Sequence, residues 1–570
     1  MIFFSTIVLL FCFVSCQGQE TSSYTKHIID SLDNIKPILY NKIKPKDPVC
    51  MVKINTQEEF SRINDIISEA INAGKNNIKL TIGKGIFKFY ENCILRNEEN
   101  IPNVSISVVG NHTVITSDED YDHSNIIEAW SELQYADSII EVIDKKKKLC
   151  RIPYRNQLDQ EEMSKLTKVQ ISQWFRSNIY DVEKIDRNGI YFVAPELEYV
   201  ERFGRKSYNV NYDYLYLKKK ARFRLYNKTK EHNCSASCFI RIKNANYGII
   251  TIKGIDFKSN KGGAPLISLS NVKAKQVIIN NCSFEHIRGN VVNFSEVGNV
   301  AFTNNIVRNT QGNEIRFVNN CPNVRVTGNI FENCGVMLNN TLCVTCQESS
   351  YYIANNIFSD FGSAAIGVGK RHKSHYSGGI IENNEIYFTM TYFAESWKHM
   401  LMDSGAIYTW TQNDDVIIRY NYIHDYAGAG DNRGIFCDDG ANNIKIYGNI
   451  ILNIANSYCI DSRFVKDQDS SFHNNSNNFL GNNIVNSPIR FQGYQSENRH
   501  CVKTTNYCFY KNEKQNNKYK DLEIEESDIF ICLDEISVSE DNINKKQRNL
   551  LKRAIKDKFI RKKIRNIKLL

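Results

Sequence analysis

Two stretches near the middle of the chain, VAFTNNIV (300–307) and VRVTGNIF (324–331), are built alike. Each begins with a short alternating segment, reaches a turn that contains asparagine, and resumes with apolar residues. Alternation with a period of two over so few residues predicts strands and not helices. Related segments are VIINNCSF (277–284), YIANNIF (352–358), IIENNEI (380–386), IIRYNYI (417–423), IKIYGNII (444–451) and FLGNNIV (479–485).

The repeat has a recognisable period. Its turn position falls at residues 255, 282, 305, 329, 356, 384, 421, 449 and 483, so that the spacing varies from 23 to 37 residues. A unit of this size cannot bury its own inner face, but stacked units can cover one another. Asparagine suits the turn because it tolerates the left-handed conformation and its amide can bond to the next unit. The pattern resembles the right-handed parallel β-helix of carbohydrate-active enzymes, which gives an all-β solenoid over residues 247–495.

The region before the repeat predicts a cap and an insertion. Thr56-Gln-Glu-Glu59 is a capping box, and the apolar residues behind it follow helical spacing up to about Gly74. This helix would cover the open end of the first coil within residues 20–116. Residues 117–246 break the period and contain a hairpin signal at Asn188-Gly189, so we interpret them as an inserted β-rich subdomain.

The amino terminus predicts an export signal. Residues 1–19 contain an apolar run of signal-peptide length, which is too short to span a bilayer. Cleavage before Cys16 would make that cysteine a lipidated first residue, and cleavage a few residues later would release the chain. We therefore expect a periplasmic, outer-membrane-anchored or extracellular protein.

Seventeen cysteines are scattered along the chain, which argues against a complete disulfide framework. Some pairs, for example Cys501 with Cys508, could still form in an exported protein. We interpret Cys343-x-x-Cys346 as buried small side chains, because the chain has no second C-x-x-C pair with which to build a zinc site. No metal and no cofactor is predicted.

The net charge of +9 is concentrated at one end. Residues 545–570 contain 12 Lys and Arg and one Asp, and the remainder of the chain is slightly acidic. This confinement argues against nucleic-acid binding. The tail within residues 496–570 predicts an amphipathic helix with Leu551, Ile555 and Phe559 on one stripe, either docked on the body or touching an anionic surface. We expect a monomer.

Two coils, AIYTWTQNDDVIIRYN (406–421) and GIFCDDGANNIKIYGN (434–449), align without gaps, and CIDSRF (459–464) begins the next. Corresponding residues of successive coils stand about 4.8 Å apart. Alternation then predicts two columns on one outer face. One column contains Trp410, Asp438 and Arg463, and the other contains Tyr408, Phe436 and Asp461.

Aromatic rings beside carboxylates and an arginine are typical of a sugar-binding site. Cleavage of a glycosidic bond needs two carboxyl groups, and Asp403, Asp438 and Asp439 are the candidates here. Asp-Asp-Gly is also a turn signature, which explains Asp439 without catalysis. The predicted substrate-binding residues are Tyr408, Trp410, His424, Arg433, Asp461 and Arg463.

The segments DSGAIYTW (403–410), NYIHD (421–425) and GIFCDDGANN (434–443) resemble those of β-helix glycosidases, and glycoside hydrolase family 141 is the most similar family. The resemblance implies fucose- or xylose-type substrates and two catalytic aspartates on neighbouring coils, which fall on Asp403 and on Asp438 or Asp439. It covers these coils alone.

Two other functions fit the same sequence. The segment GKRHKSHYSGG (369–379) supplies Lys370, Arg371, His372 and His375, which could neutralise a uronate and remove its proton in a polysaccharide lyase. A solvated basic loop explains the same residues. The aromatic face could also retain a glycan without any turnover, because a fold does not determine a function.

Overall fold

The computed structural model describes the core of the repeat and parts of its surroundings. The residues described are 27, 29–37, 43–89, 95–97, 104–117, 137–139, 141–144, 146–153, 166–173, 176–194, 198–200, 214–216, 220–227, 238–258, 264–310, 312, 314–335, 341–370, 376–388, 404–411, 413–426, 432–438, 441–454, 458–462, 478–481, 483–485, 489–491, 502–503, 507–510, 529–532, 536–538, 546–547, 549–550 and 567–569.

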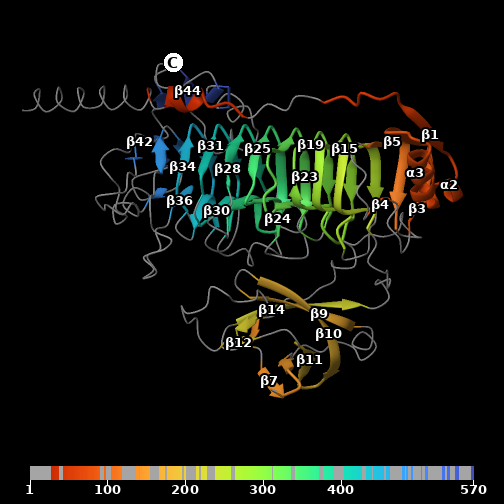
Figure 1. Ribbon diagram of the computed structural model, residues 1–570. Helices are drawn as coiled ribbons and strands as arrows, with labels where there is room; N and C mark the ends of the chain where they lie inside the picture. Colours follow the sequence, from red (N-terminus) through yellow and green to blue (C-terminus); the bar gives the residue numbers. More distant parts are fainter. Residues whose placement is uncertain are drawn as a thin grey trace, which may run out of the picture.

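The chain forms a right-handed parallel β-helix, as the repeat predicts (Figure 1). Three columns of parallel strands run along its axis, and we call them sheets 1, 2 and 3. In each complete coil the chain passes from sheet 3 to sheet 1 and then to sheet 2. The long strands β5 (Ser105–Thr116), β15 (Ile240–Lys258) and β16 (Ile267–Asn280) each contribute to more than one sheet.

Sheet 1 carries the strands that precede the asparagine turn. Besides parts of the three long strands it contains β1 (Cys50–Ile54), β2 (Asn77–Ile82), β19 (Val300–Thr303), β22 (Val324–Thr327), β25 (Ser350–Ala354), β28 (Gly378–Glu382), β31 (Asp415–Arg419), β34 (Ile444–Tyr447), β37 (Phe479–Gly481) and β40 (Val502–Lys503).

Sheet 2 follows the turn. Its strands are β3 (Gly85–Lys88), β17 (Ser283–Glu285), β20 (Ile306–Arg308), β23 (Ile330–Cys334), β26 (Ile357–Phe361), β29 (Glu385–Tyr387), β32 (Tyr422–His424), β35 (Ile450–Leu452), β38 (Ile484–Val485), β41 (Tyr507–Tyr510) and β42 (Ile529–Cys532), with parts of β5 and β15.

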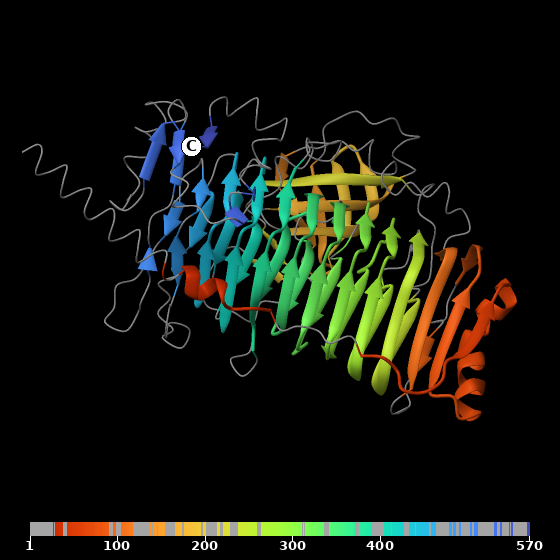
Figure 2. The ribbon, with the colours of Figure 1, turned by 90° about the horizontal axis from the view of Figure 1, so that it is seen from above.

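Sheet 3 completes each coil. Its strands are β4 (Leu95–Asn97), β18 (Val292–Val297), β21 (Ile315–Val318), β24 (Leu342–Gln347), β27 (Ala364–Gly369), β30 (Ser404–Trp410), β33 (Asn432–Asp438), β36 (Ile460–Ser462) and β39 (Ile489–Phe491), with parts of β15 and β16. Figure 2 shows the strands side by side along the axis.

An asparagine ladder stands at the corner between sheets 1 and 2. The backbone N–H of Asn356 donates to Oδ1 of Asn384 at 3.1 Å, and its amide donates to the same atom at 2.9 Å. The backbone N–H of Asn384 and its amide make the same pair of bonds to Asn421, at 3.1 and 3.0 Å. Because these amides are buried, the ladder satisfies polar groups that would otherwise lack partners. Its members are Asn305, Asn329, Asn356, Asn384, Asn421, Asn449 and Asn483.

We predicted that one asparagine both takes the left-handed conformation and bonds to the next coil, but two adjacent residues share these roles. The left-handed conformation belongs to the residue before the ladder position, such as Asn355 with a φ of 56° or Gly448 with a φ of 65°. Tyr420 takes the same conformation with a φ of 55°. The ladder asparagine is therefore selected for its hydrogen bonds alone.

The N-terminal cap forms as predicted. Thr56 Oγ1 accepts from the N–H of Glu59, and the Glu59 carboxylate accepts from the N–H of Thr56, which completes the capping box. The backbone N–H groups of Asn55 and Thr56 both donate to the Glu59 carboxylate and lower its pKa. The helical segment is divided at Arg62 into α2 (Gln57–Ser61) and α3 (Ile63–Asn72), whose buried side chains join the central core.

A separate antiparallel sheet is built from the chain between coils (Figure 1). The hairpin predicted at Asn188-Gly189 is confirmed, since Asp186 pairs with Gly189 across it. The strands, in sheet order, are β6 (Asp137–Ile139), β14 (Lys220–Asn227), β9 (Leu166–Gln173), β10 (Arg176–Asp186), β11 (Gly189–Val193), β8 (Leu149–Ile152) and β7 (Glu141–Asp144). The strands β12 (Glu198–Val200) and β13 (Tyr214–Tyr216) form a second, parallel pair.

The carboxyl-terminal tail is only partly helical. Residues 546, 547, 549 and 550 are helical, and Leu550 packs against the outer face of sheet 1. Leu551, Ile555 and Phe559 lie outside the described residues. We predicted a helix up to the end of the chain, and this prediction is wrong for residues 567–569. They form β44 (Ile567–Leu569), which pairs in parallel with β43 (Ile536–Val538). No helix within the described part of the chain is long and apolar enough to cross a membrane.

One segment takes a path that the sequence did not indicate. Residues 29–37, which we call the strap, cross the outer face of sheet 1 far from the cap that follows them in sequence (Figure 2). Asp33 accepts hydrogen bonds from Tyr420 at 2.7 Å and from Tyr447 at 3.1 Å, and it lies 3.4 Å from Arg419. Ile29 packs on the apolar residues of the same face.

Candidate functional site

The outer face of sheet 3 carries those members of the two predicted columns that the structure describes. Tyr408 on β30 pairs with Phe436 on β33, which pairs with Asp461 on β36. Trp410 pairs with Asp438 in the same way. The intervening side chains are buried in the core, as alternation predicts: Ile407, Thr409, Ile435, Cys437, Ile460 and Ser462.

Trp410 packs against two glycine residues of the preceding coil. Gly367 and Gly369 of β27 pair with Tyr408 and Trp410, and a Cβ at Gly369 would stand 2.6 Å from the indole. The absence of side chains at these two positions lets the indole lie close to the strand. Tyr408 and Trp410 stack with their centroids 5.6 Å apart and both are half-buried, so that they form an aromatic platform.

Asp438 stands at the carboxyl end of β33, beside this platform. Its Oδ2 accepts a hydrogen bond from the Tyr408 hydroxyl at 3.1 Å, and the side chain is half-buried. Its backbone carbonyl accepts from the N–H of Ala441, which fixes the turn that follows. One carboxylate is therefore held in place against an aromatic surface while remaining partly open to solvent.

A buried ion pair supports the platform from below. Nε of Arg433 donates to Oδ2 of Asp461 at 2.8 Å, and neither side chain has any exposed surface. The guanidinium lies 4.1 Å from the ring centroid of Phe436, and Phe436 lies 5.3 Å from Tyr408. We predicted that Arg433 and Asp461 contact a glycan; both side chains are fully buried in this structure, and the contact stays a prediction. Alternation reveals which face a side chain occupies and does not reveal what covers it.

His424 belongs to a different face. It lies on β32 in sheet 2, buried between Tyr387 and Tyr422 at centroid distances of 4.9 and 4.1 Å. Its Nδ1 is 3.1 Å from Asp425, and its Nε2 is 3.5 Å from Glu385. The structure thus does not bring His424 to the sheet 3 columns, contrary to our placement, because the chain turns a corner between β32 and β33.

Several predicted residues lie outside the described part of the chain. They are Cys16, Asp403, Asp439 and Arg463. Ser404, which follows Asp403, is buried, and its hydroxyl lies 3.0 Å from that of Tyr426. This contact fixes the start of β30.

The basic segment that suggested a lyase is anchored by its first residue. Nζ of Lys370 donates to both carboxylate oxygens of Asp414, at 3.1 and 3.0 Å, and Lys370 is buried. The N–H of Ser377 donates to the same carboxylate at 2.7 Å, so that both ends of the segment are tied to Asp414. Arg371, His372 and His375 lie outside the described residues.

Sequence reasoning missed a buried acid inside the solenoid. Glu314 is fully buried, and it accepts a hydrogen bond from the N–H of Gly335 at 3.0 Å. Desolvation raises the pKa of this carboxyl group to about 8, so that it is largely protonated at neutral pH. The position just before a core strand offered no signal, since turns also carry exposed acids.

The ten cysteines whose side chains the structure describes are free thiols, and nine of them are buried. Cys501 lies outside the described residues, so its pairing with Cys508 stays a prediction. Burial raises the pKa of Cys437 to about 12 and that of Cys346 well above its ordinary value. Such thiols behave as small apolar side chains. Within the described part of the chain, no group of three or more His, Cys, Asp or Glu side chains could hold a metal ion.

Comparisons with known proteins found similar solved structures and no sequence match. No family model matches the chain, and no curated protein matches it. A solved structure titled "Glycoside hydrolase" is 10% identical over 76% of this chain and 96% of its own, with a TM-score of 0.45. The XylC complex with xylose is 8% identical over 81% of this chain and 84% of its own, with a TM-score of 0.38.

A third similar structure is the family 28 exopolygalacturonase of Yersinia enterocolitica. It is 10% identical over 72% of this chain and 79% of its own, with a TM-score of 0.25. At these identities and TM-scores the likenesses carry no conclusion about the activity of this chain. Membership of glycoside hydrolase family 141 stays a prediction.

Proposed function

We propose that the chain is a glycoside hydrolase whose active site is the outer face of sheet 3. The observation that carries the proposal is the half-buried carboxylate of Asp438, held by the Tyr408 hydroxyl at 3.1 Å beside the stacked pair of Tyr408 and Trp410. Aromatic rings bind the apolar faces of sugars, and a carboxylate at the edge of such a platform is placed to act on the linkage.

We assign Asp438 the role of nucleophile or base. The Tyr408 hydroxyl donates to Oδ2 of Asp438 and so orients the carboxylate for attack on the sugar carbon or for activation of a water molecule. The proton donor would be Asp403 or Asp439, which precede β30 and follow Asp438 in the sequence. The pair of Arg433 and Asp461 holds Phe436 beneath Tyr408, and so keeps the platform rigid.

The burial of Lys370 favours hydrolysis over elimination. A lyase needs a cation beside the uronate and a base at its α-carbon. Lys370 is held by Asp414 and is buried, so it is not free for either role in this structure. The described residues thus offer a carboxylate for hydrolysis and leave the lyase dependent on residues 371–375.

The test is incubation with a panel of plant and host glycans, with products analysed by mass. We expect products that have gained one water, and we expect the Asp403→Asn and Asp438→Asn variants to fold and to lose this activity. Products with the mass and ultraviolet absorbance of an unsaturated sugar would establish a lyase instead. Binding without any product across the panel would establish a glycan-binding protein.

A further inference from the structure

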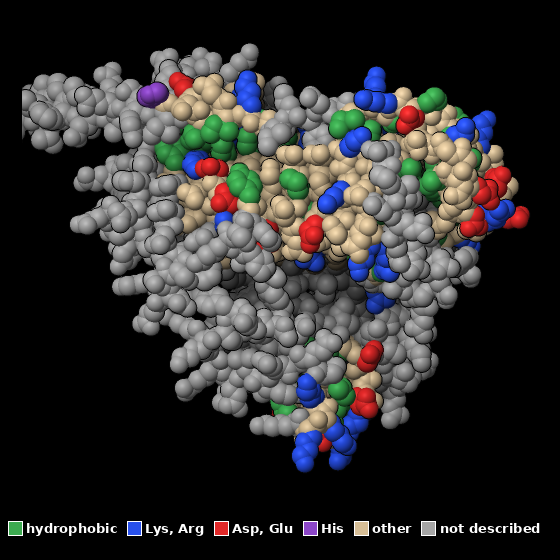
Figure 3. Space-filling view, viewed as in Figure 1, with side chains coloured by type: hydrophobic (Ala, Val, Ile, Leu, Met, Phe, Trp, Pro, Cys, Tyr) green, Lys and Arg blue, Asp and Glu red, His purple; other side chains and the backbone are tan. Residues whose placement is uncertain are grey.

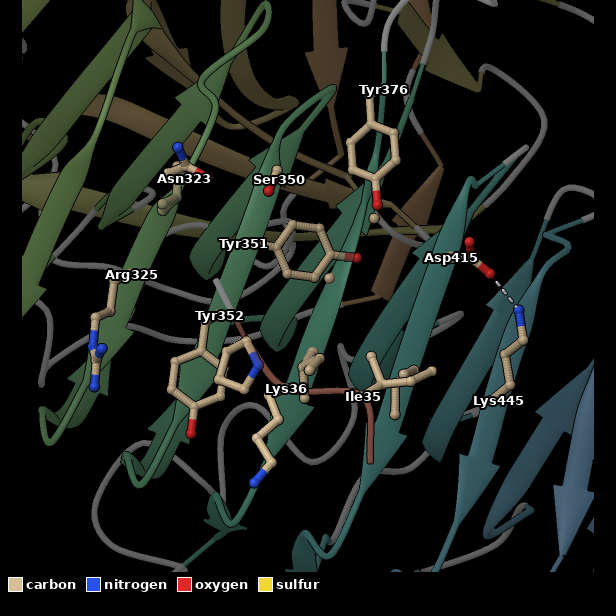
Figure 4. A pocket seen from close by; sticks show the side chains of 16 residues that line it. Ile35, Lys36, Asn323, Arg325, Ser350, Tyr351, Tyr352, Tyr376, Asp415 and Lys445 are labelled. Atoms are coloured by element: carbon tan, nitrogen blue, oxygen red, sulfur yellow. Dashed lines mark hydrogen bonds and ion pairs between the residues drawn. The ribbon is translucent and has the colours of Figure 1, made fainter. Parts of the chain in front are cut away.

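A pocket of about 280 Å³ lies on the outer face of sheet 1, which is a different wall from the proposed active site (Figure 4). Strands β22, β25, β28, β31 and β34 form its floor, and Ile35, Lys36 and Pro37 of the strap form one wall. Its size is at the small end for ligand sites, which suits one sugar ring better than an extended chain.

The pocket combines aromatic and apolar surface. Tyr352 on β25 and Tyr376 stand on two sides, and Ile380 and Ile417 contribute to the floor (Figure 4). Gly378 makes room for Tyr376, because a Cβ at Gly378 would stand 2.7 Å from the Tyr376 hydroxyl. Two phenol rings at such a floor can hold a sugar ring through its apolar faces.

The pocket is lined by more positive than negative side chains. Lys445 donates to Asp415 at 2.6 Å, so these two neutralise each other. Arg325 lies over the Tyr352 ring at 5.4 Å, and Lys36 enters from the strap. Arg325 and Lys36 therefore leave an excess of positive charge, which favours an anionic ligand.

The lining of the pocket also includes a buried tyrosine. Tyr351 contributes to the lining and is 4% exposed, and among the described residues its hydroxyl has no hydrogen-bond partner. In Figure 4 the Tyr351 ring extends toward the space between Tyr376 and Asp415. Its side chain belongs to the central core, on the opposite face of β25 from Tyr352, and so supports the floor of the pocket from behind.

We propose that this pocket binds an acidic sugar, a pyranose ring that carries a carboxylate. Arg325 and Lys36 bind the carboxylate, Tyr352 and Tyr376 hold the ring, and Asp415 accepts hydrogen bonds from its hydroxyl groups. Because the strap supplies one wall, the site exists only while Asp33 holds the strap on Arg419, Tyr420 and Tyr447. This site is separate from the active site on sheet 3 and does not depend on its activity.

The test is calorimetric or NMR titration of the full chain with glucuronate and galacturonate, against glucose, galactose and inorganic phosphate. We expect saturable binding of a uronate and none of the neutral sugars or of phosphate. Arg325→Gln should weaken binding about tenfold or more, since a hydrogen bond to a charged group is lost. The matched control Arg308→Gln, on β20 in sheet 2, should leave binding unchanged.

The strap gives a second, remote test. Asp33→Ala should weaken uronate binding about tenfold, because its lost hydrogen bonds loosen a wall of the pocket. Asp65→Ala on α3 should not. Circular dichroism and thermal melting establish that each variant folds, and the Asp438→Asn variant should bind the uronate as the natural chain does. Absent uronate binding, equal binding of phosphate, or equal binding by Arg325→Gln would each overturn the proposal.

Discussion

The same coils present two outer faces that differ in what covers them. On sheet 1, the strap lies over Arg419, which binds Glu382 at 2.6 Å and Tyr447 at 3.0 Å. On sheet 3, Tyr408, Trp410 and Asp438 remain half-buried above the pair of Arg433 and Asp461. Figure 3 shows acidic and basic side chains interspersed over the described surface that faces the viewer in Figure 1.

The comparison distinguishes the buried ion pairs, which both faces share, from the groups above them, which differ. Each face contains a buried arginine paired with a carboxylate, and in each case the pair fixes neighbouring aromatic rings. The faces differ in the layer above, which is the strap on sheet 1 and an accessible carboxylate with two stacked rings on sheet 3. An arginine–carboxylate pair therefore does not identify an active site in this fold, and our proposal rests instead on the half-buried carboxylate of Asp438 beside its aromatic platform.

The largest expected effect comes from breaking the pair on sheet 3. Asp461→Ala leaves the Arg433 guanidinium buried without its partner, and we expect a loss of about 3 to 5 kcal/mol in the free energy of unfolding. Chemical denaturation measures it. The double variant Arg433→Met, Asp461→Leu should recover most of the loss, because no charge is then buried. A single variant as stable as the natural chain would contradict the burial.

Glu314 is a buried acid with no cationic partner among the described residues, so its effect on stability should depend on pH in a way that neither ion pair predicts. Glu314 has a pKa of about 8 in the folded state against 4.5 for an exposed glutamate, so the folded state retains a proton that the unfolded state loses. Between pH 4.5 and 8 the stability should therefore fall as pH rises, by an amount on the order of 4 kcal/mol.

The matched variant is Glu314→Gln, which cannot ionise. Its stability should not fall over this range, and it should exceed that of the natural chain at pH 8. Thermal melts at several pH values measure both proteins. An identical slope in the two proteins would show that another group is responsible.

Releasing the strap should have a smaller effect. Asp33→Ala removes hydrogen bonds to two tyrosines and one arginine, and we expect a loss of about 1 to 3 kcal/mol. Hydrogen exchange should increase at Tyr420 and Tyr447 while the coils near β16 stay protected. Uniform exchange across all coils would show that the strap supports the whole solenoid.

The smallest effect concerns the platform. Trp410→Ala should leave folding intact and weaken the binding of an oligosaccharide by about tenfold, because one stacking surface is lost. The affinity for the oligosaccharide is compared between Asp438→Asn and the double variant Asp438→Asn, Trp410→Ala, because neither protein consumes the substrate. Trp130→Ala, 280 positions before Trp410 in the sequence, serves as the control substitution.

The repeat made the fold predictable, and the lack of a repeat made much of the site unpredictable. Nine turn positions located the corner between sheets 1 and 2, since apolar alternation and asparagine recur there. The register of Trp410 with Asp438 also followed, because the two coils align without gaps. The strap contacts depend on Asp33 reaching residues nearly 390 positions later, and no local pattern encodes them.

Glycine offered a signal that we did not use. The segment AAIGVG in β27 alternates glycine at Gly367 and Gly369, at the positions that face outward beneath Trp410. Small residues on one face opposite a large aromatic residue in the next coil indicate that the ring lies flat on the sheet. The burial of Arg433 and Asp461 left no such trace, because coverage depends on the surrounding chain.

The most direct test of the account is a crystal structure of the Asp438→Asn variant with an oligosaccharide substrate found by the glycan panel. The account predicts a sugar ring against Tyr408 and Trp410, with the glycosidic bond beside residue 438. A substrate bound only at the sheet 1 pocket, or at any place away from sheet 3, would contradict it.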